Sequence, residues 1–170
     1  MMMMSLRGVR IAAALTSMLA LAACAKHDPS LANGAGGLGA NGAGGLAGPG
    51  TQQDFVVNVG DRVFFEEDQS DLTATAQATL TKQAQWLRTY PSYTVTIEGH
   101  ADERGTREYN IALGARRAQS TRDYLVSQGI GAQRMRTISY GKERPVATCN
   151  DASCWTQNRR AVTVLNGGNS

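Results

Sequence analysis

Residues 94–125 read TVTIEGHADERGTREYNIALGARRAQSTRDYL, and this stretch decides the fold. Its β-branched residues alternate at the start, which predicts a strand that ends at Gly99. A polar loop follows. The pattern changes at about Glu108, after which Asn110, Leu113, Arg117, Tyr124 and their neighbours recur at spacings of three and four, and this predicts a helix. Asp102 therefore lies just past a strand end, and Arg117 projects from the next helix.

Asp102 and Arg117 carry opposite charges, and the strand-to-helix arrangement presents them side by side. A carboxylate can bind an ammonium group, and a guanidinium can bind a carboxylate through two parallel hydrogen bonds. The pair therefore fits a ligand that carries both groups, such as an amino acid. The alternative is an intramolecular salt bridge that fixes the loop, which contributes about 0–1 kcal/mol when exposed.

The residues on either side of this stretch predict three more strands and one more helix. Thr73 is a suitable N-cap for a helix that runs to about Thr89 and ends before Pro91. Further strands are expected at 61–65, 134–140 and 161–165, with a charged loop at 66–72, irregular chain at 149–154 and a helical turn at 155–159. The order β-α-β-α-β-β predicts an α+β fold with two helices packed on one face of a mixed four-stranded sheet.

The N-terminal residues form a secretory signal. Arg7 and Arg10 precede an apolar run at 11–23, which is shorter than the about 20 residues of a spanning helix. Its end, Leu-Ala-Ala-Cys24, resembles the lipobox of bacterial lipoproteins, in which the cysteine is acylated and becomes the mature N-terminus. Ala25 after that cysteine implies transport to the outer membrane. An ordinary cleavable signal with an incidental cysteine is the alternative.

Four parts follow one another along the chain. They are a lipoprotein signal peptide at 1–23, a lipidated N-terminus with a Gly-rich flexible linker at 24–54, a globular domain at 55–166 and a tail at 167–170. The linker contains the sequence NGAGGL twice and has no apolar face to bury. A Gly-rich coil of this length has an average reach of about 30 Å, which suits a leash between a membrane and a folded head.

Charge and length limit the function classes. The chain without its signal has 147 residues, enough for one domain and a tail. The signal contains two of the 17 basic residues, so 15 remain against 14 acidic ones. This near balance argues against nucleic acid as a partner, which would require a basic face.

Cys149 and Cys154 remain once Cys24 is assigned to the lipid anchor. An exported chain meets an oxidising compartment, so a C-x4-C pair predicts a small disulfide loop. Two free thiols or a weak metal site are the alternatives. No cofactor is expected.

Several motifs, in the right order, resemble the signature of the OmpA-like peptidoglycan-binding domain. They are IEGHADERG at 97–105, Tyr109-Asn110, Leu113-Gly114 and Arg117-Ala118. With the lipobox, the linker, SYGKERP at 139–145 and NRRA at 158–161, the chain is similar to lipid-anchored members of this family. The likeness covers about residues 61–165 and implies an OmpA-like sandwich fold.

The resemblance implies that the domain binds the diaminopimelate of the cell-wall stem peptide without covalent bonds. Asp102 would take the ligand ammonium, and Arg117 would take a carboxylate. Asn110 would hydrogen-bond from the same helix face, with Leu113 as an apolar floor.

The exit of the first strand departs from the family pattern. Many members have a Phe-Asp step there that lines the ligand pocket, whereas this chain has Phe65-Glu66. The Glu66 side chain reaches farther than Asp, and a backbone N–H contact from this loop is still expected. Arg159, before the last strand, is a further candidate for a carboxylate contact.

An enzyme is the competing class, for instance a metal-dependent cell-wall hydrolase. His100 beside Asp102 suggests a base or a metal ligand. A catalytic zinc needs three protein ligands, however, and Glu98 with these two residues forms a poor set. The chain also lacks G-x-S-x-G and P-loop motifs. We therefore expect a non-catalytic protein in which His100 is a hydrogen-bonding structural residue. A module of the same fold that binds only proteins is the third hypothesis.

The resemblance also implies partners and a location. The lipid anchor would hold the protein on the periplasmic face of the outer membrane, and the domain would bind peptidoglycan. Further partners would be proteins of the Tol system, chiefly TolB, with a role in envelope integrity and in constriction at cell division. The domain itself is expected to be monomeric.

Overall fold

The computed structural model describes residues 48–167, so the predicted signal, Cys24, most of the linker and most of the tail lie outside the described residues. The elements in chain order are α1 (Gln52–Asp54), the π-helical turn η1 (Phe55–Val59), β1 (Arg62–Phe64), α2 (Ala74–Thr89), β2 (Thr94–His100), α3 (Arg107–Ser127), the 3-10 turn η2 (Ala132–Arg134), β3 (Met135–Gly141), α4 (Ala152–Asn158) and β4 (Arg160–Asn166). None of the helices between residues 48 and 167 is long and apolar enough to cross a membrane.

The four strands form one mixed sheet in the order β1-β4-β2-β3. β4 runs antiparallel to both of its neighbours, with Val63 opposite Ala161 on one side and Ile97 opposite Thr163 on the other. β2 and β3 run parallel, and α3 makes the crossover that a parallel pair requires. Because β1 and β2 are both antiparallel to β4, their C-terminal ends lie at the same edge of the sheet.

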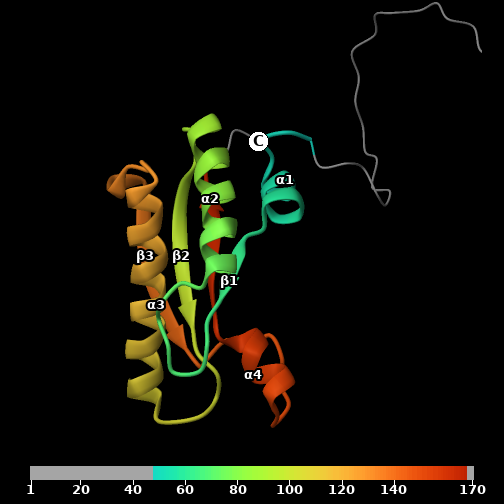
Figure 1. Cartoon of the computed structure of the whole chain (residues 1–170), viewed down its shortest axis with the longest axis vertical. Coiled ribbons are helices and arrows are strands. Elements are labelled where there is room, and N and C mark those ends of the chain that lie inside the picture. The colour runs from blue at the N-terminus through green and yellow to red at the C-terminus, as the bar shows by residue number, and fades with distance from the viewer. Residues whose placement is uncertain (1–47, 168–170) are drawn as a thin grey trace, which may run out of the picture. The chain divides into compact units, whose positions relative to one another are not determined.

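Helices α2 and α3 cover one face of this sheet (Figure 1). Thr73 caps α2 by accepting a hydrogen bond from the Ala76 N–H at 3.2 Å. Leu80 and Leu87 of α2 and Ile97 of β2 are completely buried between the layers. The fold class and both major helices agree with the sequence prediction.

The segment before β1 is helical, although the sequence analysis assigned its first residues to the linker. Thr51 caps α1, and the Asp54 carboxylate accepts a hydrogen bond from the indole N–H of Trp86 at 2.8 Å. Phe55 is fully buried with its ring edge-on to Trp86, at a centroid distance of 4.9 Å. These contacts join residues more than 30 positions apart, so no local pattern in the sequence indicates them.

Helix α4 also differs from the expectation, which placed irregular chain at 149–154 and a helical turn at 155–159. The helix begins at Ala152 because Asp151 is an N-cap whose carboxylate accepts a hydrogen bond from the Ser153 N–H at 2.8 Å. A disulfide joins Cys149 to Cys154 in the first turn of the helix, consistent with the predicted pair.

Candidate functional site

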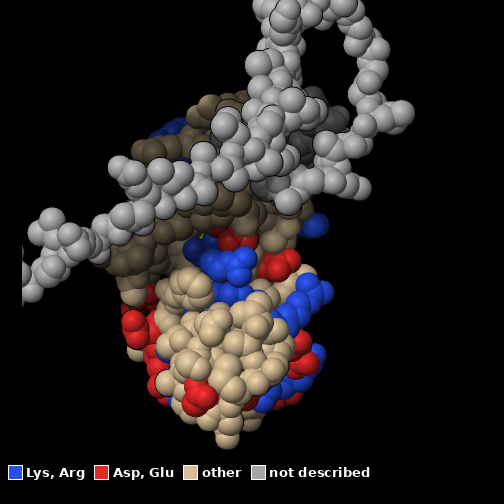
Figure 2. All heavy atoms as spheres, turned by 90° about the vertical axis from the view of Figure 1, so that its right-hand side faces the viewer, with Lys and Arg blue, Asp and Glu red and all other residues tan. Residues whose placement is uncertain are grey.

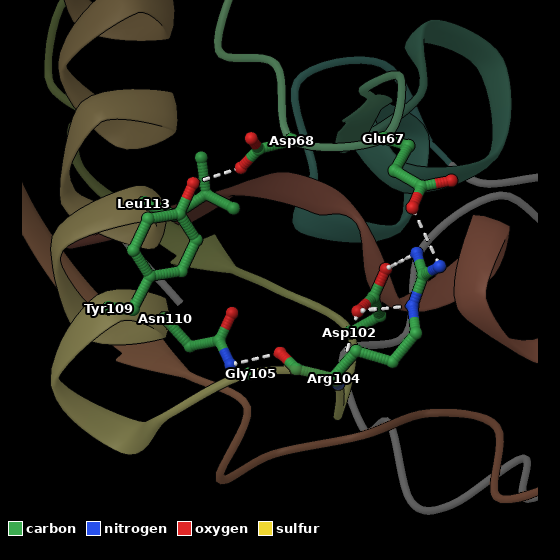
Figure 3. A pocket seen from close by; sticks show the side chains of 8 residues that line it. All are labelled: Glu67, Asp68, Asp102, Arg104, Gly105, Tyr109, Asn110 and Leu113. Atoms are coloured by element: carbon green, nitrogen blue, oxygen red, sulfur yellow. Dashed lines mark hydrogen bonds and ion pairs between the residues drawn. The ribbon is translucent and has the colours of Figure 1, made fainter.

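A cavity of about 340 Å³ opens where the ends of β1 and β2 meet the start of α3 (Figure 3). Eight residues line it: Glu67, Asp68, Asp102, Arg104, Gly105, Tyr109, Asn110 and Leu113. Three of them are carboxylates and one is a guanidinium, so the lining carries a net negative charge. A cavity of this charge favours a cationic group in its ligand.

Two glycines bring α3 close to the end of β2 and so position the cavity. A Cβ atom at Gly99 would overlap the carbonyl oxygen of Gly114, and a Cβ atom at Gly114 would lie 2.8 Å from the carbonyl oxygen of Gly99. Only glycine allows this approach. It holds Asn110 and Leu113 over the end of β2, next to Asp102.

The loop between β2 and α3 is also fixed by local chemistry. Gly105 has a φ of +84°, and Thr106 then caps α3 through the N–H of Tyr109. Asn110 is 2% exposed, and its side-chain amide donates to the carbonyl of Arg104 at 2.7 Å. Asn110 thus lines the cavity as predicted, while its amide N–H holds the loop.

Asp102 lies in this cavity and accepts hydrogen bonds from two arginines. Oδ1 accepts from the backbone N–H and the Nε of Arg104, both at 3.2 Å, and Oδ2 accepts from Arg104 Nη2 at 2.7 Å and from Arg159 Nη1 at 3.4 Å. Burial on its own would raise the pKa of Asp102, but the hydrogen bonds from Arg104 and Arg159 lower it below the ordinary value. Asp102 is therefore an anion at neutral pH.

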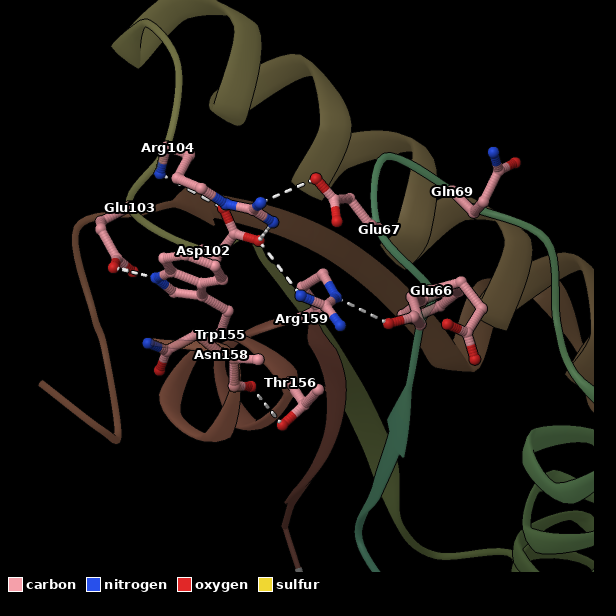
Figure 4. A network of polar contacts seen from close by, with 12 residues as sticks. Glu66, Glu67, Gln69, Asp102, Glu103, Arg104, Trp155, Thr156, Asn158 and Arg159 are labelled. Atoms are coloured by element: carbon pink, nitrogen blue, oxygen red, sulfur yellow. Dashed lines mark hydrogen bonds and ion pairs between the residues drawn. The ribbon is translucent and has the colours of Figure 1, made fainter. Parts of the chain in front are cut away.

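Arg104 spans the mouth of the cavity. It donates from Nη1 to the carboxylate of Glu67 at 2.7 Å, and its guanidinium lies 4.1 Å from the ring centre of Trp155 (Figure 4). Its hydrogen bond to Asp102 raises the pKa of Arg104 above its ordinary value. The Trp155 indole N–H in turn donates to the carboxylate of Glu103, so helix α4 braces this loop.

Arg117 lies beneath the cavity and does not line it. Its guanidinium is fully buried and donates to three backbone carbonyls, those of Gln69 at 2.8 Å, His100 at 2.8 Å and Glu66 at 3.2 Å. Burial lowers its pKa to about 10, and the positive charge of Arg159 acts in the same direction. Among the described residues, the ion pairs of Asp102 are therefore with Arg104 and Arg159, not with Arg117.

The remaining predicted residues line a second cavity of about 360 Å³. Phe65, Glu66 and Arg159 lie there with Phe64, Thr73, Thr156 and Gln157. Arg159 is 7% exposed and connects the two cavities, because it also donates from Nε to the carbonyl of Phe65 at 3.1 Å (Figure 4). The structure thus gathers Asp102, Asn110 and Leu113 in one cavity and places the other predicted residues beside or beneath it.

The sequence analysis gave no role in the site to five of the lining residues: Glu67, Asp68, Arg104, Gly105 and Tyr109. Tyr109 donates from its hydroxyl to the Asp68 carboxylate, which joins α3 to the loop after β1. Two signals could have found this group. Arg104 follows Asp102 by two residues, the spacing at which an aspartate side chain bonds its own backbone. The acidic residues Glu66, Glu67 and Asp68 also follow β1 at the edge of the sheet where β2 ends.

His100 is 2% exposed, and neither ring nitrogen has a hydrogen-bond partner within residues 48–167. The expectation of a hydrogen-bonding ring is therefore wrong, although the backbone carbonyl accepts a bond from Arg117. Burial lowers the pKa of His100 to about 4, and the charges of Arg160 and Arg144 contribute in the same direction. No group of three possible metal ligands occurs in the described part of the chain.

Basic and acidic side chains are mixed over the face seen in Figure 2, with uncharged atoms between them. This face is therefore not a continuous basic surface of the kind that binds nucleic acid.

Fold and cavity together define a small α+β domain with an anionic pocket at the end of its central strand. The profile of the OmpA family matches residues 64–160, and the chain belongs to this family. The resemblance seen in the sequence is thus confirmed.

Within this family, the chain is 66% identical over 157 residues to the "Peptidoglycan-associated lipoprotein" of Rhizobium meliloti, covering 92% of this chain and 88% of the relative. A crystal structure of the peptidoglycan-associated lipoprotein from Burkholderia pseudomallei is 42% identical, with a TM-score of 0.61, and covers 62% of this chain and 90% of that one. The C-terminal domain of Helicobacter pylori MotB shares the fold at 18% identity, with a TM-score of 0.60 over 64% of this chain and 85% of that one.

Proposed function

We propose that this protein is an outer-membrane lipoprotein whose domain binds peptidoglycan without covalent bonds, through the diaminopimelate of the stem peptide. The observation that carries the proposal is the ionised Asp102 carboxylate in an anionic cavity of an OmpA-family domain. The ligand ammonium would bind Asp102, and Leu113 would contact its aliphatic chain. The names of the relatives, which refer to peptidoglycan and to a lipoprotein, support this assignment.

In this proposal, Arg117 acts on the ligand from beneath the cavity, whereas Asp102 contacts it inside the cavity. The three recorded bonds of Arg117 use three of the five N–H groups of a guanidinium. Its positive charge lies beneath the cavity and would attract a ligand carboxylate. Direct contact between that carboxylate and the guanidinium would require the carbonyls of the loop at 66–69 to move. Phe65, Glu66 and Arg159 would contact the part of the ligand that extends into the second cavity.

The wider role follows from the anchor and the family. We propose that residues 1–23 are removed as the signal, that acylated Cys24 holds the protein on the periplasmic face of the outer membrane, and that residues 24–54 act as the leash. The domain at 55–166 would bind the wall as a non-catalytic monomer. It would work with Tol proteins, chiefly TolB, in envelope integrity and constriction. Many weak wall contacts give a tether that can be redistributed.

Sedimentation with isolated peptidoglycan sacculi tests the proposal. The full chain should sediment with sacculi, and Asp102→Asn should raise the dissociation constant for sacculi at least about tenfold, because one charge-assisted contact contributes about 1.5–3 kcal/mol. Asp123→Asn is the matched control, since this aspartate is exposed on α3 and away from the cavity. Equal sedimentation of Asp102→Asn would favour a module that binds only proteins. Release of wall fragments, with or without added zinc, would favour a hydrolase.

A further inference from the structure

The Asp102 carboxylate has no acceptor position left for a ligand in the described structure. A carboxylate offers about four lone-pair sites on its two oxygens. Arg104 fills three of them, through its backbone N–H and Nε on Oδ1 and its Nη2 on Oδ2, and Arg159 fills the fourth. An ammonium group can bind Asp102 only if one of these donors leaves.

Two of the donors are held in place, the Arg159 side chain and the backbone N–H of Arg104. Arg159 is 7% exposed and makes two hydrogen bonds with the backbone of Phe65. Its Nε donates to the Phe65 carbonyl at 3.1 Å, and its own carbonyl accepts from the Phe65 N–H at 2.9 Å. The backbone N–H of Arg104 is held by the turn that leads through Gly105 into α3. To leave Asp102, the buried Arg159 side chain would have to give up its bond to Phe65, and the Arg104 N–H would have to move the turn before α3.

The Arg104 side chain, in contrast, lies at the surface and has partners other than Asp102. It is 35% exposed and lines the cavity. Glu67, which is 67% exposed, and the ring of Trp155 both contact its guanidinium, so Arg104 retains partners when it leaves Asp102 (Figure 4). Its departure would free one site on each carboxylate oxygen.

We propose that the Arg104 side chain occupies the place of the ligand ammonium on Asp102 and is displaced when the ligand binds. This inference rests on the proposed function, because it concerns the same cavity. Arg104 is then a residue that sets affinity: it orients Asp102 in the free protein and opposes binding by competing for the carboxylate.

The proposal predicts that removal of Arg104 tightens binding. Titration of the full chain with meso-diaminopimelate should give a dissociation constant about three- to tenfold lower for Arg104→Ala than for the parent, which is the range for a partly exposed charge-assisted pair. Arg104→Gln should act in the same direction, and it provides the measurement if the alanine variant does not fold. Arg104→Lys should return the constant toward the parent value, because its ammonium can again occupy Asp102.

Arg107→Ala is the matched control, since Arg107 lies three residues further on, is 66% exposed and pairs with Glu143 instead of Asp102. Its dissociation constant should equal that of the parent. Suppose that the parent binds and that its binding depends on Asp102. If Arg104→Ala and Arg104→Gln then both bind no more tightly than the parent, this inference is overturned while the proposed function stands. If neither the parent nor Arg104→Ala binds, or if Asp102→Asn binds as the parent does, the proposed function falls with it.

Discussion

Two arginines near Asp102 have opposite surroundings, and they divide the site into two regions. Arg117 belongs to a buried base, which we define as Arg117 with the Gly99–Gly114 contact between β2 and α3. Arg104 belongs to an exposed mouth, which we define as Arg104 and Glu67. Groups in the base bond to backbone and shape the domain, whereas groups in the mouth bond to one another and can exchange with a ligand. Changes in the base should therefore alter stability, and changes in the mouth should alter binding.

Replacement of Arg117 gives the largest expected effect on stability. Arg117→Met keeps most of the volume but leaves the carbonyls of Glu66, Gln69 and His100 without the buried guanidinium that donates to them. We expect the free energy of unfolding to fall by about 3–5 kcal/mol, measured by urea denaturation. Arg116→Met, at the exposed neighbouring position, should change it by less than about 0.5 kcal/mol. Equal stability of the two variants would remove the distinction between base and mouth.

Gly114→Ala tests the close approach in the base. The added Cβ would meet the Ser139 hydroxyl and the backbone of Gly99, so α3 must shift from β2. Such overpacking should lower the free energy of unfolding by about 1–3 kcal/mol. In Gly131→Ala the new Cβ meets only the flexible end of Gln133, and stability should stay near that of the parent. A parent-like melting temperature for Gly114→Ala would show that the helix is free to move.

His100 should make stability depend on pH. Its pKa is about 4 in the folded protein and about 6.5 when unfolded, so the unfolded chain binds more protons between these values. Stability is therefore complete above about pH 6.5 and falls as the pH drops toward 4, by at most about 1.4 kcal/mol per unit. Urea denaturation of His100→Gln at pH 4–7 should show a smaller slope than the parent. The same slope in both proteins would contradict the burial of a neutral imidazole.

A change in the mouth should have the smallest effect on stability. Glu67→Gln weakens one exposed ion pair with Arg104, and we expect the free energy of unfolding to change by less than about 1 kcal/mol. Thermal unfolding of the variant beside the parent provides the measurement. A loss as large as that of Arg117→Met would mean that the mouth is part of the structural core.

The order of elements and the position of Asp102 were predictable because their signals are local. Alternation in β2, helical spacing in α3 and the cap at Thr73 each lie within a few residues of the element that they specify. The burial of Arg117 was not predictable in the same way. Its partners come from two distant segments. They are backbone carbonyls, which every residue has, so the sequence does not indicate which of them will accept these bonds.

The mouth illustrates the same limit. Glu67 and Arg104 are 37 positions apart, and Trp155 contacts Arg104 from a helix that the sequence analysis began too late. Their approach depends on β1 and β2 ending at one edge of the sheet, which the strand order determines. The sequence therefore indicated Asp102 as the anion of the site but not the arginine that covers it.

The central claim is that Asp102 binds the ammonium of diaminopimelate in the cavity between β2 and α3. The most direct test is a titration of the full chain with meso-diaminopimelate, followed through the backbone amide signals in NMR. We predict saturable shifts at residues 102–113, with none in Asp102→Asn at the same ligand concentrations. Shifts that lie elsewhere, or that persist unchanged in Asp102→Asn, would contradict the claim.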